Sequence, residues 1–302
     1  HMLSCALTLA LSAGVAFSAS AKTVLKLSHN NDKTHPVHIS MQYMADEVKK
    51  LTNGEVVIRI YPNSQLGSQR ESMELLQAGS LDMAKSNASE LEAFEPSYGA
   101  YNIPYLFHDV NHYYRVLLDP AVGQKILDSS KGKGFVGLTY YDGGARSFYS
   151  AKPIQSPEDL KGMKIRVPAS KLFIDTLNAM GASAVPMSFS ETISALQQNV
   201  IDGLEGSYAT NYLTKTYELR KNMSLTKHFL GTAGVYISTK VWDKLTDEQK
   251  AIIQEEFDKA AENNNKNLVE LDKELVKNLE DAGVKINEVN LPEFAKLVEK
   301  VK

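Results

Sequence analysis

The run DLKGMKIRVPAS at residues 159–170 sets one arginine, Arg166, among strand-forming residues and ends that strand with Pro168. A guanidinium is almost never fully buried without a partner. Arg166 must therefore lie at a solvated edge or meet an anionic group. Taken alone, the residue is more typical of a structural ion pair, or of a side chain that reaches the surface, than of a ligand-binding group.

Strand-like and helix-like patterns alternate along the chain around this run. Strands are predicted at residues 24–28, 56–62, near 83, 135–141, 147–151, 163–168 and 183–187, with a long β-rich run at 228–239. Amphipathic patterns predict helices at 38–51, at 70–82, at 170–182 and from residue 190. This order favours βαβ units and a mostly parallel sheet, and the run at 228–239 is long enough to cross from one domain to another.

The C-terminal part predicts one very long helix. Thr246-Asp-Glu-Gln249 has the form of a capping box, and the helical pattern continues to Asp281 before Gly283 ends it. About 36 residues at roughly 1.5 Å each exceed the diameter of a small domain. Unless it breaks at the three asparagines 263–265, this helix must span two lobes.

The charge balance excludes a nucleic-acid partner. The 302 residues carry 33 Lys and Arg against 36 Asp and Glu, a formal net charge of -3, and contain no basic block or stripe. Without such a patch the protein has nothing to neutralise a row of phosphates.

Residues 1–21 have the composition of a targeting segment. His1 and Met2 look like the remnant of an expression tag, and residues 3–21 are small and apolar and end in the Ala-Ser-Ala pattern that signal peptidases cut. We interpret the segment as a truncated signal peptide; a transmembrane helix fits less well because the run is short and rich in small residues. We therefore expect a periplasmic mature protein without a disulfide, because the single cysteine is Cys5.

Several motifs that could carry chemistry fail on their context. GKGFVG at 132–137 has the letters of a dinucleotide fingerprint but follows a helical pattern and enters a strand, the reverse of the required order. The pairs His35/His38 and His108/His112 have no third ligand at a recognisable spacing, which favours loop or cap roles over a metal site. With no G-x-S-x-G elbow or other catalytic constellation, we expect no enzyme, no cofactor and no metal; a periplasmic enzyme stays as an alternative.

Two arginines and one polar run are the candidates for binding. Arg146 in GGARSFYS and Arg166 in KGMKIRVP each lie in or beside a predicted strand, and a turn and short helix between them would bring them close. The run His29-Asn30-Asn31-Asp32 follows the first strand, where open α/β sheets place ligand contacts.

Four stretches of the chain resemble the solute-binding proteins of TRAP transporters, the DctP-like family. They are YPNSQLG at 61–67, SPEDLKGMKIRVPAS at 156–170, VPMSFSETISALQQNVIDGLEG at 185–206 and the long C-terminal helix. The similarity runs in order, with matching spacing, from about Thr23 to Asn290. It is therefore more specific than any single motif.

The resemblance implies an α/β, two-lobe periplasmic-binding-protein fold with crossing strands and a long C-terminal helix spanning both lobes. Lobe I would comprise residues 22–143 plus 232–271, and lobe II residues 144–231 plus 272–302. The expected partners are a small organic acid and the TRAP membrane permease subunits, and the expected state is a monomer.

The resemblance also implies roles for particular residues. In the family, the arginine of the KIRVP-like strand grips the ligand's carboxylate, and it maps onto Arg166. A second arginine that assists maps onto Arg146, and the aromatic residue that packs on the ligand maps onto Phe189. A guanidinium fork matches the two oxygens of a carboxylate, so the chemistry agrees with this transfer.

The sequence departs from the family pattern in two places. Where many relatives have D-G-x-E-N-P, with a ligand-binding asparagine, this chain has Gly206 and Ser207 after Glu205, and Tyr208, Asn211 or Tyr212 would fill the space. Sialic-acid binders have a glutamate and an arginine where this chain has Asn87 and Glu90, so we do not expect sialic acid.

The candidate ligand-binding residues are Arg166, Arg146, Phe189, Asn30, Asn87, Glu90, Glu205, Tyr208 and Asn211. Two cations among hydroxyl-binding groups favour a hydroxylated monocarboxylate such as a sugar acid. A C4-dicarboxylate and a zwitterion, with its ammonium on Glu90, remain as alternative ligands. The protein could also present its ligand to a membrane sensor rather than to a transporter.

Overall fold

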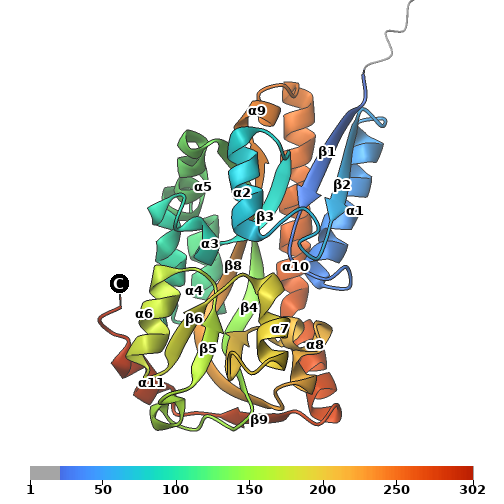
Figure 1. Ribbon diagram of the computed structural model, residues 1–302. Helices are drawn as coiled ribbons and strands as arrows, with labels where there is room; N and C mark the ends of the chain where they lie inside the picture. Colours follow the sequence, from blue (N-terminus) through green and yellow to red (C-terminus); the bar gives the residue numbers. More distant parts are fainter. Residues whose placement is uncertain (1–20, 302) are drawn as a thin grey trace, which may run out of the picture.

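The computed structural model of the protein describes residues 21–301 (Figure 1). The predicted signal peptide lies outside the described residues apart from Ala21. Within residues 21–301, no helix combines the length and the apolar character that a bilayer crossing requires.

The N-terminal part forms the predicted βαβ units. Its strands are β1 (Thr23–Ser28), β2 (Val56–Tyr61) and β3 (Met83–Asn87), and its helices are α1 (Pro36–Leu51) and α2 (Gln69–Ala78). β1 pairs in parallel with both β2 and β3. Each crossover helix therefore returns the chain to the same end of the sheet, and the carboxyl ends of β1 and β3 lie together.

A second set of short elements follows in the middle of the chain. These are β5 (Lys164–Val167), α6 (Lys171–Ala179), β6 (Ser183–Pro186), α7 (Phe189–Gln197), β7 (Gly203–Gly206) and α8 (Tyr208–Leu213). β5 pairs in parallel with β6 and β7. As the sequence predicts, β5 ends at Val167, immediately before Pro168.

Two long strands connect these sets. β4 (Phe135–Ser150) and β8 (Asn222–Ser238) have 16 and 17 residues and pair antiparallel along their length. The sheet order is β2-β1-β3-β8-β4-β7-β5-β6, with β9 (Lys285–Glu288) paired to β8. The sheet is therefore mixed; the prediction of a mostly parallel sheet fails at its centre, where β4 and β8 are antiparallel to each other and to β7 and β3.

The hydrophobic core consists of four clusters that divide into two halves. Two clusters draw on residues 25–141 and 230–261, and the other two on residue 105 and on residues 148–229 and 279–301. The register of β4 against β8 shifts between Asp142 and Gly144, close to this division. We propose that the halves are the two lobes, with lobe I at 22–143 plus 232–271 and lobe II at 144–231 plus 272–302.

The long C-terminal helix is confirmed. α10 (Asp247–Asp281) has 35 residues, starts with the Thr246/Gln249 capping box and is followed by Gly283 at φ +89°. Phe257 packs in a cluster of the first half and Leu279 in a cluster of the second. Figure 1 shows the helix running along the whole sheet, so it ties both halves together.

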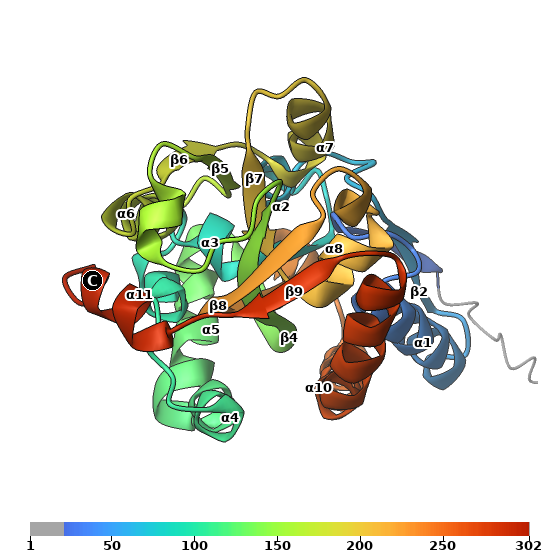
Figure 2. The ribbon, with the colours of Figure 1, turned by 90° about the horizontal axis from the view of Figure 1, so that it is seen from below.

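Two of the remaining helices are expected from the sequence: α5 (Lys125–Ser129), in the helical pattern before Gly132, and η4 (Pro157–Leu160), the short helix after Ser156. The others lack a strong sequence pattern; they are α3 (Ala88–Leu91), η1 (Pro96–Asn102), α4 (Val110–Leu118), η2 (Pro120–Gln124), η3 (Ser130–Lys133), η5 (Thr216–Glu218), α9 (Thr239–Trp242) and α11 (Leu291–Leu297). In Figure 2, α4 and α10 lie on the same side of the central strands.

The cap of α10 gives a first expected result. Thr246 accepts a hydrogen bond from the Gln249 backbone N–H at 3.1 Å through its side-chain oxygen. Thr246→Ala should lower the free energy of unfolding by about 1 kcal/mol, the usual cost of losing such a cap. Urea denaturation checks this, with Thr34→Ala, in an exposed turn, as a comparison; an unchanged midpoint for Thr246→Ala would contradict the capping role.

Candidate functional site

The candidate site consists of two cavities at the junction of the halves. The first, which we call the Arg146 cavity, is lined by Asn31, His35, Val37, Lys85, Asn87, Ser89, Asn102, Gly143, Arg146, Phe173, Ser207, Thr210 and residues 230–233. The second, the Phe189 cavity, is lined by Asn30, Ser64, Ser68, Gln69, Arg70, Glu90, Ala169, Ser188, Phe189 and Ser190. Both draw on elements of the two halves, so a molecule bound there would contact each half.

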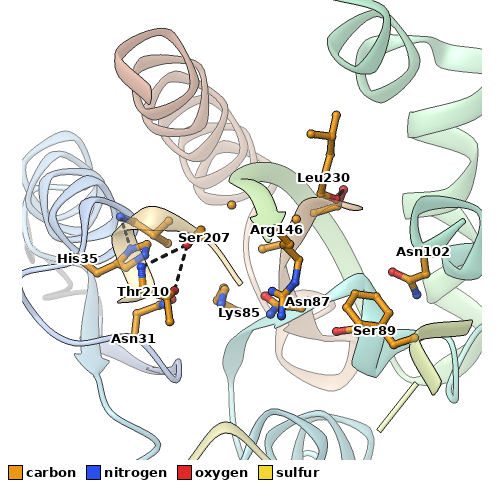
Figure 3. A pocket seen from close by; sticks show the side chains of 16 residues that line it. Asn31, His35, Lys85, Asn87, Ser89, Asn102, Arg146, Ser207, Thr210 and Leu230 are labelled. Atoms are coloured by element: carbon orange, nitrogen blue, oxygen red, sulfur yellow. Dashed lines mark hydrogen bonds between the residues drawn. The ribbon is translucent and has the colours of Figure 1, made fainter. Parts of the chain in front are cut away.

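Strand ends and helix starts position the side chains of the Arg146 cavity. Figure 3 shows Lys85 and Asn87, from β3, beside Arg146, from β4, with Ser207 and Thr210 on the other side near His35. Ser207 is the N-cap of α8 and accepts a hydrogen bond from the Thr210 backbone N–H. This clustering fits the rule that ligands of open α/β sheets bind at the carboxyl ends of strands.

Arg146 is held by a buried carboxylate. Its Nε donates to Glu205 Oε2 at 2.7 Å, and its Nη2 donates to Glu205 Oε1 at 2.6 Å. His228 Nε2 lies 3.2 Å from Glu205 Oε2 and stacks on Phe148. Glu205 therefore acts as the internal counter-ion of Arg146, and it does not line either cavity.

The ionisation of this cluster follows from its contacts. Burial alone would raise the pKa of Glu205, but the ion pair with Arg146 and the His228 contact lower it to about 2. Burial lowers the pKa of His228 despite the neighbouring carboxylate. At neutral pH the cluster is therefore an ionised Arg146–Glu205 pair beside a neutral imidazole.

Arg166 is a buried cation without a carboxylate partner among the described residues. It therefore does not form the structural ion pair that its sequence context favours. Its side chain is 4% exposed, and Nε and Nη2 both donate to Met187 O, at 3.1 and 3.0 Å. Among residues 21–301, no carboxylate lies within ion-pair distance of it. Burial, and then the Arg146 charge, lower its pKa to about 10, so it stays charged at neutral pH.

The ring of Phe189 lies beside this guanidinium. The Arg166 carbon Cζ is 5.6 Å from the ring centroid, a cation–π distance. Phe189 is the first residue of α7, and Ser188 before it forms a capping box with Glu191. The helix start therefore fixes the ring between Arg166 and the Phe189 cavity.

Asn30 and Glu90 line the same cavity from the other half. Glu90, in α3, is buried, and burial raises the pKa of its carboxyl group although Arg166 opposes the rise. Asn30 Oδ1 accepts a hydrogen bond of 3.0 Å from Lys85 Nζ, which lines the Arg146 cavity. This contact places the two cavities next to each other.

Four of the expected residues line neither cavity: Arg166, which lies beside the Phe189 ring, Glu205, Tyr208 and Asn211. Tyr208 lines a separate groove with Asp272 and Lys227. Asn211 is fully buried, and neither its Oδ1 nor its Nδ2 has a hydrogen-bond partner among the described residues. The family resemblance predicted Tyr208 and Asn211 in the site from their positions along the chain, whereas α8 directs Tyr208 toward Asp272 of α10.

Several lining residues were missed from the sequence, above all Lys85, His35 and Phe173. Lys85 lies in the middle of β3, MAKSN, where a lone lysine among uncharged residues is a weak but readable signal. Phe173 stacks on Phe229 at 3.9 Å between centroids and lies under Arg146. These contacts join segments far apart in the chain, which sequence reading does not reveal.

The histidines have the structural roles that the sequence predicts. His35 is the N-cap of α1 and accepts from the Val37 backbone N–H through Nδ1, while the His108 backbone N–H donates to His112 Nδ1. Within residues 21–301 no cluster of three or more metal-ligating side chains occurs.

The geometry defines a class of protein, and comparison with known proteins defines the family. Two half-sheets joined by crossing strands, with a buried cationic cleft between them, form a periplasmic-binding-protein-like fold. The family model for bacterial extracellular solute-binding protein, family 7 (DctP), matches residues 27–302. The chain belongs to this family, and it is a TRAP-transporter periplasmic solute-binding protein.

Three solved TRAP periplasmic solute-binding proteins illustrate the similarity. One from Xanthobacter autotrophicus, with β-D-galacturonate bound, is 32% identical, covers 92% of this chain and 93% of its own, and has a TM-score of 0.89. One from Fusobacterium nucleatum, with sn-glycerol 3-phosphate bound, is 37% identical, covers 92% of this chain and 91% of its own, and has a TM-score of 0.88. One from Anaerococcus prevotii, with D-glucuronate bound, is 30% identical, covers 93% of this chain and 91% of its own, and has a TM-score of 0.90.

These matches settle several predictions made from the sequence. The TRAP family, the α/β binding-protein fold and the periplasmic location are confirmed. Membership of a family of binding proteins also confirms that the protein is not an enzyme. The individual ligand-binding residues stay predictions.

Proposed function

We propose that the protein captures a small hydroxylated monocarboxylate, such as a sugar acid, in the cleft between its lobes. Arg166 holds the carboxylate, and the hydroxyl groups meet the polar side chains that line the two cavities. Two of the three solved relatives carry a hexuronate, which supports this ligand class.

The observation that carries the proposal is the state of Arg166. Its guanidinium is buried, and Met187 O accepts from only Nε and Nη2, so Nη1 and one hydrogen of Nη2 remain for a carboxylate. An unpaired buried charge is costly, whereas a bidentate carboxylate would offset that cost. Arg146 differs, because Glu205 already occupies its Nε and Nη2, and only Nη1 is left for a ligand.

Lobe closure follows from the division of the lining residues. Among the lining residues, Phe173 and Phe189 belong to proposed lobe II, whereas Asn30, Asn87 and Glu90 belong to proposed lobe I; Arg166, beside the Phe189 ring, also belongs to lobe II. An acid that contacts both sets stabilises the closed arrangement by its differential affinity for that state. Closure also removes water, which strengthens the pairing between guanidinium and carboxylate.

The energy scale limits what one arginine contributes. Hydrogen bonds to charged groups are each worth roughly 1.5–3 kcal/mol, and micromolar binding needs about 8 kcal/mol. The carboxylate contact therefore sets the class of ligand, while the hydroxyl contacts and Phe189 supply the remaining affinity.

The closed protein would then deliver the acid to the membrane permease subunits of a TRAP transporter. We expect the protein to act in the periplasm as a monomer. A membrane sensor as the receiving partner would be distinguished by the absence of two permease genes near the gene for this protein.

A thermal-shift screen tests the ligand class. The panel contains D-galacturonate, D-glucuronate, L-gulonate, sn-glycerol 3-phosphate, succinate, sialic acid and betaine. We expect the sugar acids to raise Tm most, because binding to the native state stabilises it by mass action. The largest shift with succinate or betaine would overturn the sugar-acid proposal, and no shift with any acid would overturn the binding role of the cleft.

A Phe189→Ala variant tests the second cavity. Loss of the ring should weaken binding of the best acid about tenfold, since a cation–π contact and its apolar area contribute roughly 1–2 kcal/mol. Calorimetry measures the change, with Phe107→Ala, a residue that lines neither cavity, as the control. Unchanged affinity in Phe189→Ala would contradict contact between the ring and the ligand.

A further inference from the structure

Lys85 is a second buried cation of the cleft without an anionic partner among the described residues. Its side chain, in the middle of β3, is 4% exposed, and Nζ donates a 3.0 Å hydrogen bond to Asn30 Oδ1. An ammonium has three donors, so two remain. We propose that Lys85 is a ligand-binding residue, whose ammonium binds oxygens at the end of the acid that Arg166 does not hold; this rests on the proposed function.

The position of Lys85 suits that role. It lines the Arg146 cavity from proposed lobe I, and its partner Asn30 lines the Phe189 cavity. Figure 3 shows it beside Asn87 and Arg146 in the middle of the cavity. An acid held at one end by Arg166 of lobe II and at the other by Lys85 of lobe I would join the two lobes, as a closing ligand must.

The charged and titratable groups around Lys85 provide no internal anion for it. The segment between β1 and α1 contributes His29 and His35, each with its pKa lowered to about 3 by burial and then by the Lys85 charge, so both are neutral. β4 contributes Arg146, a like charge. The carboxylate nearest to Arg146, Glu205, is already bonded to that arginine and to His228.

The charges of the cleft as a whole leave room for one ligand anion. Its cations are Lys85, Arg146 and Arg166, and its buried carboxylates are Glu205 and Glu90. Arg70, which also lines the Phe189 cavity, is exposed and paired with Glu74, so this pair adds no net charge. Protonated Lys85 gives the cleft an excess of one positive charge, which a monocarboxylate neutralises. This agrees with a sugar acid that carries a single carboxylate.

Ligand capture should then take up a proton. Burial, and then the Arg146 charge, lower the pKa of Lys85 to about 7 in the free protein. A bound anion favours the charged form and moves the pKa back toward its usual value. Below pH 7 Lys85 is already protonated and binding needs no proton, whereas above pH 7 affinity should fall by up to about tenfold per pH unit.

The alternative is a structural role in which Lys85 packs as a neutral amine against Asn30. In that case binding would neither depend on Lys85 nor take up a proton through it. The two readings therefore differ in a quantity that calorimetry measures directly, the number of protons exchanged on binding.

The experiment is isothermal titration near pH 8 in phosphate and in Tris buffer, which differ in their heats of ionisation. The probe is the tightest binder among D-galacturonate, D-glucuronate and L-gulonate. For the wild type we expect uptake of about 0.5–1 proton per acid bound, as a lysine with pKa near 7 implies. The variants are Lys85→Met and Lys85→Arg, and Lys26→Met, on an exposed position of β1, is the control.

Lys85→Met should bind at least about tenfold more weakly near pH 6.5 and take up no proton, because a charged hydrogen bond is lost. Lys85→Arg stays charged at all of these pH values, so its affinity should no longer fall above pH 7. Circular dichroism establishes whether each variant folds. If Lys85→Met does not fold, the pH dependence of affinity in Lys85→Arg decides whether Lys85 binds the ligand.

Two outcomes overturn the assignment while leaving the binding function intact. One is wild-type affinity and proton uptake in Lys85→Met. The other is an unchanged fall of affinity above pH 7 in Lys85→Arg. Failure of the wild type to bind any of the three acids would instead overturn the proposed function itself.

Discussion

Arg166→Ala should abolish the rise in Tm that a sugar acid gives the wild type, and should weaken binding at least about 100-fold. The substitution removes two charge-assisted hydrogen bonds to the carboxylate, each worth roughly 1.5–3 kcal/mol. Arg166→Lys should restore binding only in part, since an ammonium keeps the charge but loses the planar fork. Calorimetry with D-galacturonate and D-glucuronate measures both effects.

Arg59→Ala is a suitable control because it removes an exposed arginine of β2 far from the cavities. Its affinity and Tm shift should match those of the wild type. Near-native affinity in folded Arg166→Ala would show that the carboxylate is held elsewhere in the cleft.

Glu205→Gln should produce the largest loss of stability, about 3–5 kcal/mol in the free energy of unfolding. Glu205 is 1% exposed and is bonded to Arg146 and His228, so its removal leaves a half-buried guanidinium without a counter-ion. Breaking a buried pair on one side carries a cost of about this size. Urea denaturation measures the loss, and a change below 1 kcal/mol would contradict the counter-ion role.

The exposed ion pair of Glu262 with Lys266 supplies a matched control. Glu262→Gln should change stability by less than about 1 kcal/mol, because surface pairs contribute little. The two variants differ mainly in burial, so their difference isolates what burial of the charge adds.

The pH dependence of stability gives a second view of Glu205. Its pKa is about 2 in the folded protein against an ordinary 4.5. Because the folded value is the lower one, the stabilisation is fully present above pH 4.5 and is lost as pH falls from there toward 2. In Glu205→Gln this part of the acid dependence should be absent.

The order of elements could be predicted from the sequence because local patterns decide it. Alternating strands and amphipathic helices, the Thr246 capping box and Gly283 each act over a few residues, and the long helix begins and ends where they predict. The antiparallel centre of the sheet could not be predicted, because the pairing of β4 with β8 joins segments about 90 residues apart through long-range contacts.

The candidate site was predicted less completely than the fold. The strand pattern singled out Arg166 but by itself favoured a structural ion pair, and the ligand-binding role came from the family resemblance. In the structure the guanidinium is buried and has no carboxylate partner among residues 21–301. The Arg146–Glu205 pair and the position of Lys85 in the cavity depend on the pairing of strands that are far apart in the chain. The residues next to Arg146, Glu205 and Lys85 in the sequence do not determine that pairing.

The central claim is that the cleft recognises a sugar acid by its carboxylate through Arg166. The most direct test is calorimetric titration of the wild type with D-galacturonate and with D-galactose, which has a hydroxymethyl group in place of the carboxylate. We expect the acid to bind at least about 100-fold more tightly, the energy of two charge-assisted hydrogen bonds, and Arg166→Ala to lose this preference. Equal affinities for acid and neutral sugar in the wild type, or a preference that survives in Arg166→Ala, would contradict the claim.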